Sequence, residues 1–231
     1  MSRKYVLILS FLIVSIVFFS ASRANFYFNM GNHFFGGGAY DLAKAEKYYD
    51  KVVQINPELP RLNYQMARLE FIRGDFFSAI SHINKEIELF PEYKRSHYVR
   101  GLVYGFKGNY DLAISDFKEF LIWKPESWAG HNDLAWLYFQ KGDIKAVESQ
   151  ARLGLEYNPN NPWLENIYGV ALLNLERKEE SRLALKSSLE NFERIGPKEW
   201  GGAYPGNDPR IYKKGYEETL KAIRENLSLA E

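Results

Sequence analysis

The stretch GNYDLAISDFKEFLIWKP, residues 108–125, decides the fold class of this chain. It begins with Gly108 and ends with Pro125, and the residues between them include apolar side chains at helical spacing. Glycine allows the backbone angles of a tight turn, and proline cannot continue a helix. The stretch therefore predicts one amphipathic helix of about 13 residues with a turn on each side.

The same pattern recurs along the chain with a fixed period. Four prolines stand 34 residues apart, and a glycine stands 17 residues before each of the last three: Pro57, Pro91, Pro125 and Pro159, with Gly74, Gly108 and Gly142. Small residues recur at a second set of positions: Ala67, Gly101, Ala135 and Gly169, with Ala45, Ala79 and Ala113 on the following helices. A period of this length is typical of stacked helix hairpins.

Each repeat is predicted to hold two amphipathic helices joined by the turn at the glycine. The small residues allow the paired helices to approach closely, and large residues such as Tyr49, Phe117, Tyr104 and Tyr138 fill the space beyond them. The proline ends the second helix and sets the start of the next repeat.

Three segments in register, residues 74–91, 108–125 and 142–159, resemble the tetratricopeptide repeat (TPR) family. The resemblance covers residues 25–193 and implies an all-α, right-handed solenoid of about five hairpins. The repeats fall at residues 25–59, 60–93, 94–127, 128–161 and 162–193. The first repeat needs two extra residues in its turn, FFGGGAY (34–40), and the fifth has Glu176 and Glu193 where glycine and proline are usual.

Two further segments follow the repeats. Residues 195–209 are rich in glycine and proline, so we expect no regular structure there. Residues 210–229 carry an apolar stripe after Asp208, a suitable helix N-cap, and Pro209. This last helix is predicted to cap the apolar end of the solenoid.

The N-terminus is predicted to be a membrane signal. Residues 5–22 are uncharged and strongly apolar, Arg3 and Lys4 precede them, and Arg23 follows. An uncleaved transmembrane helix and a cleavable export signal both fit residues 1–22. The preceding positive charges predict that the rest of the chain crosses the membrane. We expect a membrane-anchored domain outside the cytoplasm, periplasmic by default, or a soluble exported protein after cleavage.

The resemblance implies a peptide-binding groove lined by the first helix of each repeat. The groove positions with an aromatic, Arg or Asn side chain are Phe28, Asn32, Arg61, Tyr64, Arg68, Arg95, Tyr98, Asn132, Trp136, Trp163 and Asn166. Rigid aromatics give contact area at little entropic cost, Arg pairs with carboxylates, and Asn pairs with a peptide backbone. The alternative is that these aromatics pack between helices and the arginines are solvated. Phe28, Gln65 and Val99 replace the Lys, Asn and Arg of the carboxylate clamp found in some family members, which argues against that clamp.

A second candidate site is the loop around Trp200 and Tyr204. These two aromatics either contact a partner or pack within a compact connection.

Composition argues against most other functions. The formal net charge is +1, too low for non-specific nucleic-acid binding, and the absence of cysteine excludes disulfides and thiolate sites. His97 and His131 occupy equivalent positions 34 residues apart, too far from one another for a shared metal. Since no catalytic or phosphate-binding motif occurs, we expect no enzymatic activity, cofactor, metal or small-molecule substrate.

Two functions remain open at this point. The chain is expected either to bind an extended peptide of a partner protein in the groove and so aid assembly of a membrane or envelope complex, or to be a constitutive subunit of a larger membrane complex. In the second case the membrane helix and the outer face of the hairpins make the contacts.

Overall fold

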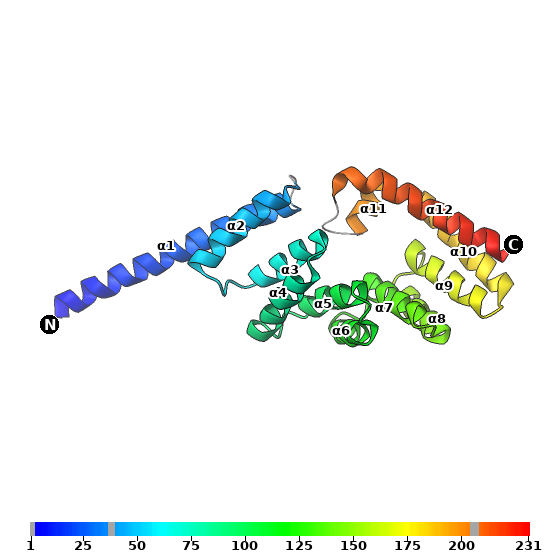
Figure 1. Cartoon of the computed structure of the whole chain (residues 1–231), viewed down its shortest axis with the longest axis horizontal. Coiled ribbons are helices and arrows are strands. Elements are labelled where there is room, and N and C mark those ends of the chain that lie inside the picture. The colour runs from blue at the N-terminus through cyan, green and yellow to red at the C-terminus, as the bar shows by residue number, and fades with distance from the viewer. Residues whose placement is uncertain (1–2, 37–39, 204–207) are drawn as a thin grey trace. The chain divides into compact units, whose positions relative to one another are not determined.

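The structure is a computed structural model that describes residues 3–36, 40–203 and 208–231, with side chains from residue 19 onward. In these residues every regular element is helical and no strand occurs, which confirms the all-α prediction (Figure 1). The helices are α1 (Arg3–Phe35), α2 (Leu42–Ile55), α3 (Leu62–Arg73), α4 (Phe76–Leu89), α5 (Arg95–Phe106), α6 (Tyr110–Trp123), α7 (Trp128–Gln140), α8 (Ile144–Tyr157), α9 (Pro162–Asn174), α10 (Lys178–Glu193), α11 (Pro197–Ala203) and α12 (Tyr212–Ala230), with a 3-10 turn at Pro209–Ile211.

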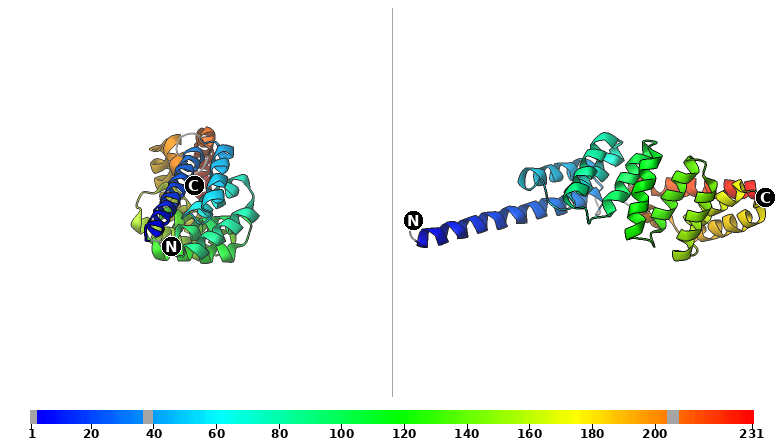
Figure 2. Two further views of the ribbon diagram at one scale, coloured as in Figure 1. Left: turned by 90° about the vertical axis from the view of Figure 1, so that its left-hand side faces the viewer. Right: turned by 90° about the horizontal axis from the view of Figure 1, so that it is seen from below.

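The chain forms two compact units, Met1–Pro91 and Glu92–Glu231. The first unit holds the hairpins α1–α2 and α3–α4. The second holds the hairpins α5–α6, α7–α8 and α9–α10, which follow one another in Figure 2, together with α11 and α12. In the second unit α5 packs on α7 and α7 packs on α9, so the first helices of successive hairpins are neighbours.

The predicted glycine turns are confirmed. Gly74, Gly108 and Gly142 have φ angles of +81°, +79° and +76°, which favour glycine over any residue with a Cβ atom. Directly after two of these turns an aspartate caps the next helix: Asp75 accepts a hydrogen bond from Ser78 N and Asp143 from Ala146 N. The Gly-Asp pair therefore ends one helix and starts the next.

The close approach of paired helices is also confirmed. A Cβ atom on Gly31 would lie 2.4 Å from the ring of Tyr49, and one on Gly101 would lie 3.0 Å from the ring of Phe117. Tyr49 and Phe117 are almost fully buried. In both hairpins a large ring on the second helix thus occupies the space left by a glycine on the first.

The fifth repeat makes its turn with an unfavourable residue. Glu176 lies between α9 and α10 with a φ of 60°, the left-handed conformation that glycine adopts at the three earlier turns. The fifth repeat therefore has the same turn conformation as the earlier repeats although it lacks their glycine. Glu176 adopts this conformation at a steric cost, because its Cβ atom is close to the backbone.

The prediction that residues 195–209 lack regular structure is wrong for Pro197–Ala203, which form α11. Pro197 stands in the first turn, where a helix tolerates proline. Gly201 serves close packing, because a Cβ atom there would lie 2.2 Å from the ring of Tyr212.

Trp200 is packed within this connection. Its side chain is buried, its Nε1 donates a hydrogen bond to Thr219 Oγ1 at 3.0 Å, and its ring lies against Gly215. Of the two alternatives for this residue the structure favours the packed connection. Tyr204 lies outside the described residues.

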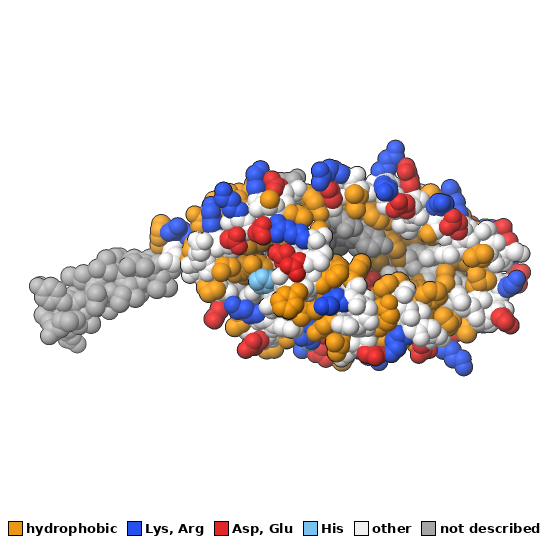
Figure 3. All heavy atoms as spheres, in the orientation of Figure 1, with side chains coloured by type: hydrophobic (Ala, Val, Ile, Leu, Met, Phe, Trp, Pro, Cys, Tyr) orange, Lys and Arg blue, Asp and Glu red, His pale blue; other side chains and the backbone are white. Residues whose placement is uncertain are grey.

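The C-terminal helix α12 packs on α10 and also contacts α9. Ile223 is buried on its inner side. Its outer side carries Lys–Glu pairs such as Lys214–Glu218 (3.7 Å) and Lys221–Glu225 (3.6 Å), and Figure 3 shows the two signs of charge side by side there. The helix is therefore covered on one side and solvated on the other.

The N-terminal helix α1 runs from Arg3 to Phe35 without interruption. Its C-terminal part supplies Ala24, Phe28 and Phe35 to the core shared with α2, and Figure 2 shows its N-terminal part continuing beyond that hairpin. The apolar segment 5–22 belongs to this helix, but its side chains up to residue 18 lie outside the described residues. Within the residues that were described, no helix is both long enough and apolar enough to cross a membrane.

Replacing Glu176 by glycine should stabilise the protein. Glycine removes the steric cost of the left-handed conformation, partly offset by its greater freedom in the unfolded chain, so we expect a gain of about 0.5–1 kcal/mol. Urea unfolding followed by circular dichroism measures the change. As a control, Lys186→Gly in the exposed middle of α10 should lower stability by about 1 kcal/mol; a loss of stability in Glu176→Gly as well would contradict the argument.

Candidate peptide-binding surface

The groove positions implied by the family resemblance fall on the first helices of the hairpins in both units. Five of them, Phe28, Asn32, Arg61, Tyr64 and Arg68, belong to α1, α3 and the residue before α3, all in the first unit. The other six lie on α5, α7 and α9 of the second unit.

In the first unit, two of the positions take part in internal packing. Phe28 is 6% exposed and its ring packs on Tyr49, so it is a core residue. Asn32 is partly buried, and its Oδ1 accepts hydrogen bonds from Tyr49 OH (2.9 Å) and Gln65 Nε2 (2.8 Å). Packing between helices, the alternative interpretation, therefore describes Phe28 and Asn32 better than exposure in a groove does.

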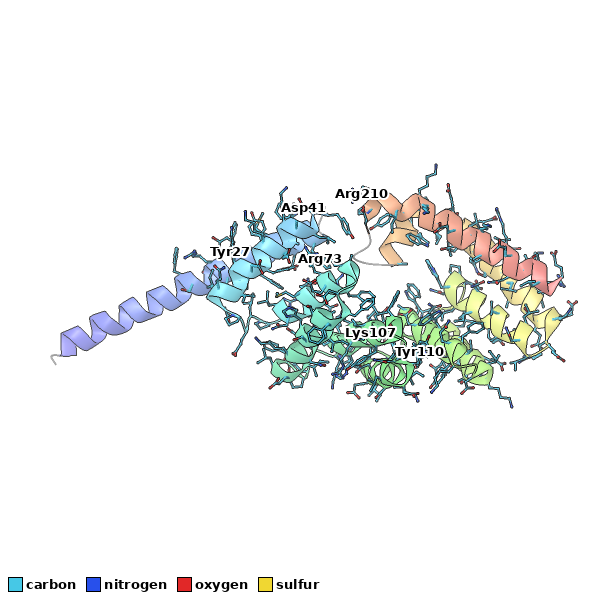
Figure 4. All side chains as sticks on the ribbon, viewed as in Figure 1. Tyr27, Asp41, Arg73, Lys107, Tyr110 and Arg210 are labelled. Carbon is cyan, nitrogen blue, oxygen red and sulfur yellow. The ribbon has the colours of Figure 1, made fainter. Side chains whose placement is uncertain are left out.

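The same network reaches Arg68 on α3. Its Nη1 donates to Gln65 Oε1 at 2.8 Å, and its guanidinium lies 4.8 Å from the centre of the Phe35 ring. Arg68 therefore connects α3 to α1. One turn further, Arg73, which Figure 4 labels at the end of α3, donates hydrogen bonds to Glu46 of α2 at 2.7 and 2.8 Å. Both arginines hold the two hairpins of this unit together.

Arg61 and Tyr64 stand at the start of α3, where a carboxylate of α4 caps the helix. Glu86 is fully buried, and its two oxygens accept from the backbone N–H of Arg61 (2.8 Å) and of Tyr64 (3.3 Å). Burial raises the pKa of Glu86, and the backbone hydrogen bonds oppose that rise. The side chain of Arg61 is exposed, and that of Tyr64 is partly exposed.

The periodic positions also carry buried polar pairs that the sequence analysis missed. Asn63 contacts His82 (3.1 Å), His97 contacts Asp116 (2.9 Å) and His131 contacts Gln150 (3.2 Å). Each pair joins the two helices of one hairpin across 19 residues, and each repeats at a distance of 34. This double spacing was the signal that could have revealed them. Arg100 completes the second pair with two bonds of 2.8 Å to Asp116.

On α9 both predicted residues, Trp163 and Asn166, contact other parts of the chain. Asn166 Oδ1 accepts a hydrogen bond of 3.0 Å from Asn226 Nδ2 on α12. Trp163 is partly buried, stacks on Trp128 with ring centres 5.0 Å apart, and meets Phe192 edge-on. The last hairpin therefore offers less free surface than its sequence predicts.

On α5 and α7 the predicted residues form one partly exposed surface. We define the α5–α7 surface by Tyr98, Asn132, Asp133 and Trp136. Tyr98 OH donates to Asp133 Oδ2 at 2.6 Å, which links the two helices. Trp136 is 39% exposed and stands one turn after Asn132 and Asp133. Its ring forms a T-shaped pair with that of Tyr110, which Figure 4 labels at the start of α6.

Two further contacts and positions describe the α5–α7 surface. The ring of Tyr98 packs on the rings of Phe117 and Phe120, with centres 5.3 and 4.9 Å away. Arg95 is exposed at the first residue of α5, one turn before Tyr98. The surface thus combines fixed aromatic rings, an amide and a carboxylate.

Asp133 was not among the predicted residues. Burial raises its pKa to about 6, and the hydrogen bond from Tyr98 opposes that rise. No periodic signal marks its position, because Gln65, Val99 and Ile167 stand at the equivalent places 34 residues apart.

The described residues contain no group of three or more His, Asp or Glu side chains that could hold a metal ion. Buried carboxylates accept hydrogen bonds locally; Glu165, for example, accepts them from Ser187 Oγ and Asn191 Nδ2. This arrangement offers hydrogen bonds and apolar contact, which suit recognition of another chain.

Comparison with known proteins agrees with this architecture. Residues 94–127 match the family model described as tetratricopeptide repeat. The chain has the fold of tetratricopeptide repeat proteins. No curated protein matches its sequence.

Solved structures support the fold over most of the chain. MamA from Desulfovibrio magneticus RS-1 is 18% identical with a TM-score of 0.62, covering 74% of this chain and 94% of MamA. YrrB, described as a TPR protein with an unusual peptide-binding site, is 16% identical with a TM-score of 0.59, covering 71% and 84%. The thermophilic TPR protein TTC0263 from Thermus thermophilus is 16% identical with a TM-score of 0.61, covering 87% and 99%.

The raised pKa of Asp133 predicts a pH-dependent stability. Its pKa of about 6 in the folded protein exceeds the unfolded value of about 3.9, so its contribution is present below pH 4 and is lost as the pH rises through 6. Between pH 4 and pH 7, the free energy of unfolding of wild type should fall by about 1–2 kcal/mol relative to that of Asp133→Asn. The loss is kept this small because partial exposure screens the charge. Urea unfolding of both proteins at each pH measures this difference, and a difference that does not change with pH would contradict it.

Proposed function

We propose that the chain is a non-enzymatic protein–protein interaction module that binds an extended segment of a partner protein on the α5–α7 surface. The observation that carries this proposal is the exposed ring of Trp136 beside the side chains of Asn132 and Asp133. A large aromatic ring beside groups that hydrogen-bond is the usual composition of an interface hot spot.

The residues of this surface suit an extended peptide. The Asn132 amide offers both a donor and an acceptor, so it can pair with a peptide backbone without depending on side-chain identity. Trp136 offers apolar area, and the ring of Tyr98 is already fixed by Phe117 and Phe120, so little freedom is lost on binding. YrrB, whose fold is similar, is described as having a peptide-binding site of its own.

We further propose that residues 5–22 anchor the chain in a membrane and that the helical hairpins lie outside the cytoplasm. The support is the uncharged apolar run behind Arg3 and Lys4. The continuity of α1 from Arg3 to Phe35 supports the uncleaved anchor, because cleavage after a signal of residues 1–22 would cut within the helix. The partner would then be another exported or membrane protein, and binding would aid assembly of a membrane or envelope complex.

A specific observation favours a second candidate, the constitutive structural subunit. On α6, Leu112, Ile122 and Trp123 are 51%, 79% and 48% exposed, which is unusual for large apolar side chains. A permanent contact with a larger complex on this outer helix would cover them.

Site-specific photo-crosslinking distinguishes the two candidates. A photoreactive amino acid at position 132 of the full chain in its own membrane should crosslink to a defined partner, and Trp136→Ala should weaken that crosslink because loss of an aromatic anchor costs about 2 kcal/mol, or about 30-fold in affinity. Trp123→Ala on α6 is the matched control and should leave the crosslink unchanged. A partner captured from position 122 alone would favour the structural subunit and contradict the groove proposal.

Protease accessibility tests the membrane placement. If residues 5–22 form an uncleaved anchor, spheroplasts treated with protease should lose the hairpins, and the purified protein should retain the mass of the full 231-residue chain. Carbonate extraction should leave it in the membrane pellet. A protein protected from protease in intact spheroplasts, or shortened by about 20 residues and released, would contradict the anchored topology.

A further inference from the structure

We infer that Asp133 forms a subsite for a cationic side chain, lysine or arginine, of the segment bound on the α5–α7 surface. The inference rests on the proposed function and specifies one feature of the partner. Its basis is a partly buried carboxylate that the described part of the chain leaves incompletely paired.

The hydrogen bonds of Asp133 are few. Oδ2 accepts one short bond from Tyr98 OH at 2.6 Å, whereas Oδ1 has only Asn132 Nδ2 at 3.5 Å, the limit of a hydrogen bond. An ionised carboxylate offers about four acceptor positions. Among the described residues no Lys, Arg or His lies within ion-pair distance of Asp133.

Two carboxylates of the same unit that are more deeply buried have more partners. Asp116 receives two bonds from Arg100 and one contact from His97. Glu165 receives bonds from Ser187 Oγ and Asn191 Nδ2. Because burying a carboxylate without a cation beside it is costly, Asp133 stands out as a group that has no cationic partner among the described residues.

The fold does not require an acid at this position. The equivalent residues of neighbouring repeats are Gln65, Val99 and Ile167, an amide and two apolar side chains. The hydrogen bond from Tyr98 would be accepted equally by an asparagine. The negative charge is therefore a property of this surface and has no structural counterpart in the other repeats.

The surroundings of Asp133 suit a cation. Trp136 follows it by one helical turn and is 39% exposed, and the phenol of Tyr98 lies on its other side. A lysine or arginine side chain could place its charge at Oδ1 and its methylene groups or guanidinium against the indole ring. Such a charge-assisted hydrogen bond is stronger than one between neutral groups.

The test uses a phage-displayed library of random dodecapeptides, selected on the full chain in detergent. Peptides selected by wild type should share one aligned basic residue, which Asp133→Asn should no longer select. Asp133→Asn keeps the size of the side chain and the acceptor for Tyr98, and its thermal melt verifies folding. Glu156→Gln, which removes an exposed charge from α8, is the matched control and should select the wild-type motif.

Synthetic peptides from the selection then give the magnitude. Replacing the basic residue by alanine should weaken binding to wild type about tenfold and binding to Asp133→Asn hardly at all. A selected motif that depends on Trp136 but has no basic residue, or one that Asp133→Asn selects unchanged, would overturn this inference alone. Failure of wild type to select any motif would overturn the proposed function together with it.

Discussion

The structure depends on the contact between a small residue on the first helix of a hairpin and a large residue on the second. Cβ atoms on Gly31, Gly101 and Gly169 would lie 2.4, 3.0 and 2.5 Å from Tyr49, Phe117 and Leu185. Such contacts fix the register of each helix pair, because sliding either helix would drive the large side chain into backbone. The first helix is then buried on the side that faces its partner, and its remaining surface is left for the next hairpin and for solvent.

Polar pairing within the hairpins adds a second constraint. The contacts Asn63–His82, His97–Asp116 and His131–Gln150 recur at one place in three successive hairpins. A buried polar group without a partner is costly, so each pair penalises any shift between its two helices. These pairs also account for the histidines that share the period of the repeat, which join the helices of a hairpin. Most of the buried polar chemistry is thereby used for structure, which is why an incompletely paired carboxylate on α7 is informative.

The sequence predicted the helices, the glycine turns and the close helix contacts, because each follows from residues within one period. It predicted less well where segments far apart in the chain meet. The bond from Asn226 to Asn166 spans 60 residues and covers a position that the family pattern places in the groove. Trp200 belongs to a glycine-rich stretch, yet Gly201 of that stretch and Gly215 of α12 permit ring contacts rather than turns. Asp133 escaped prediction since it breaks the periodic pattern and became significant only beside Tyr98.

The geometry also limits what can bind. With Asn166 bonded to α12 and Trp163 stacked on Trp128, the remaining predicted positions of the second unit lie on α5 and α7. Neighbouring helices are about 8–10 Å apart, a distance that about three extended residues span. A peptide bound there as proposed would therefore make contact over a short length, and its affinity would depend on few anchors. An apolar group on the exposed indole of Trp136 and a charge at Asp133 are both within that length, so the two together, rather than an extended set of weak contacts, would set which partner is chosen.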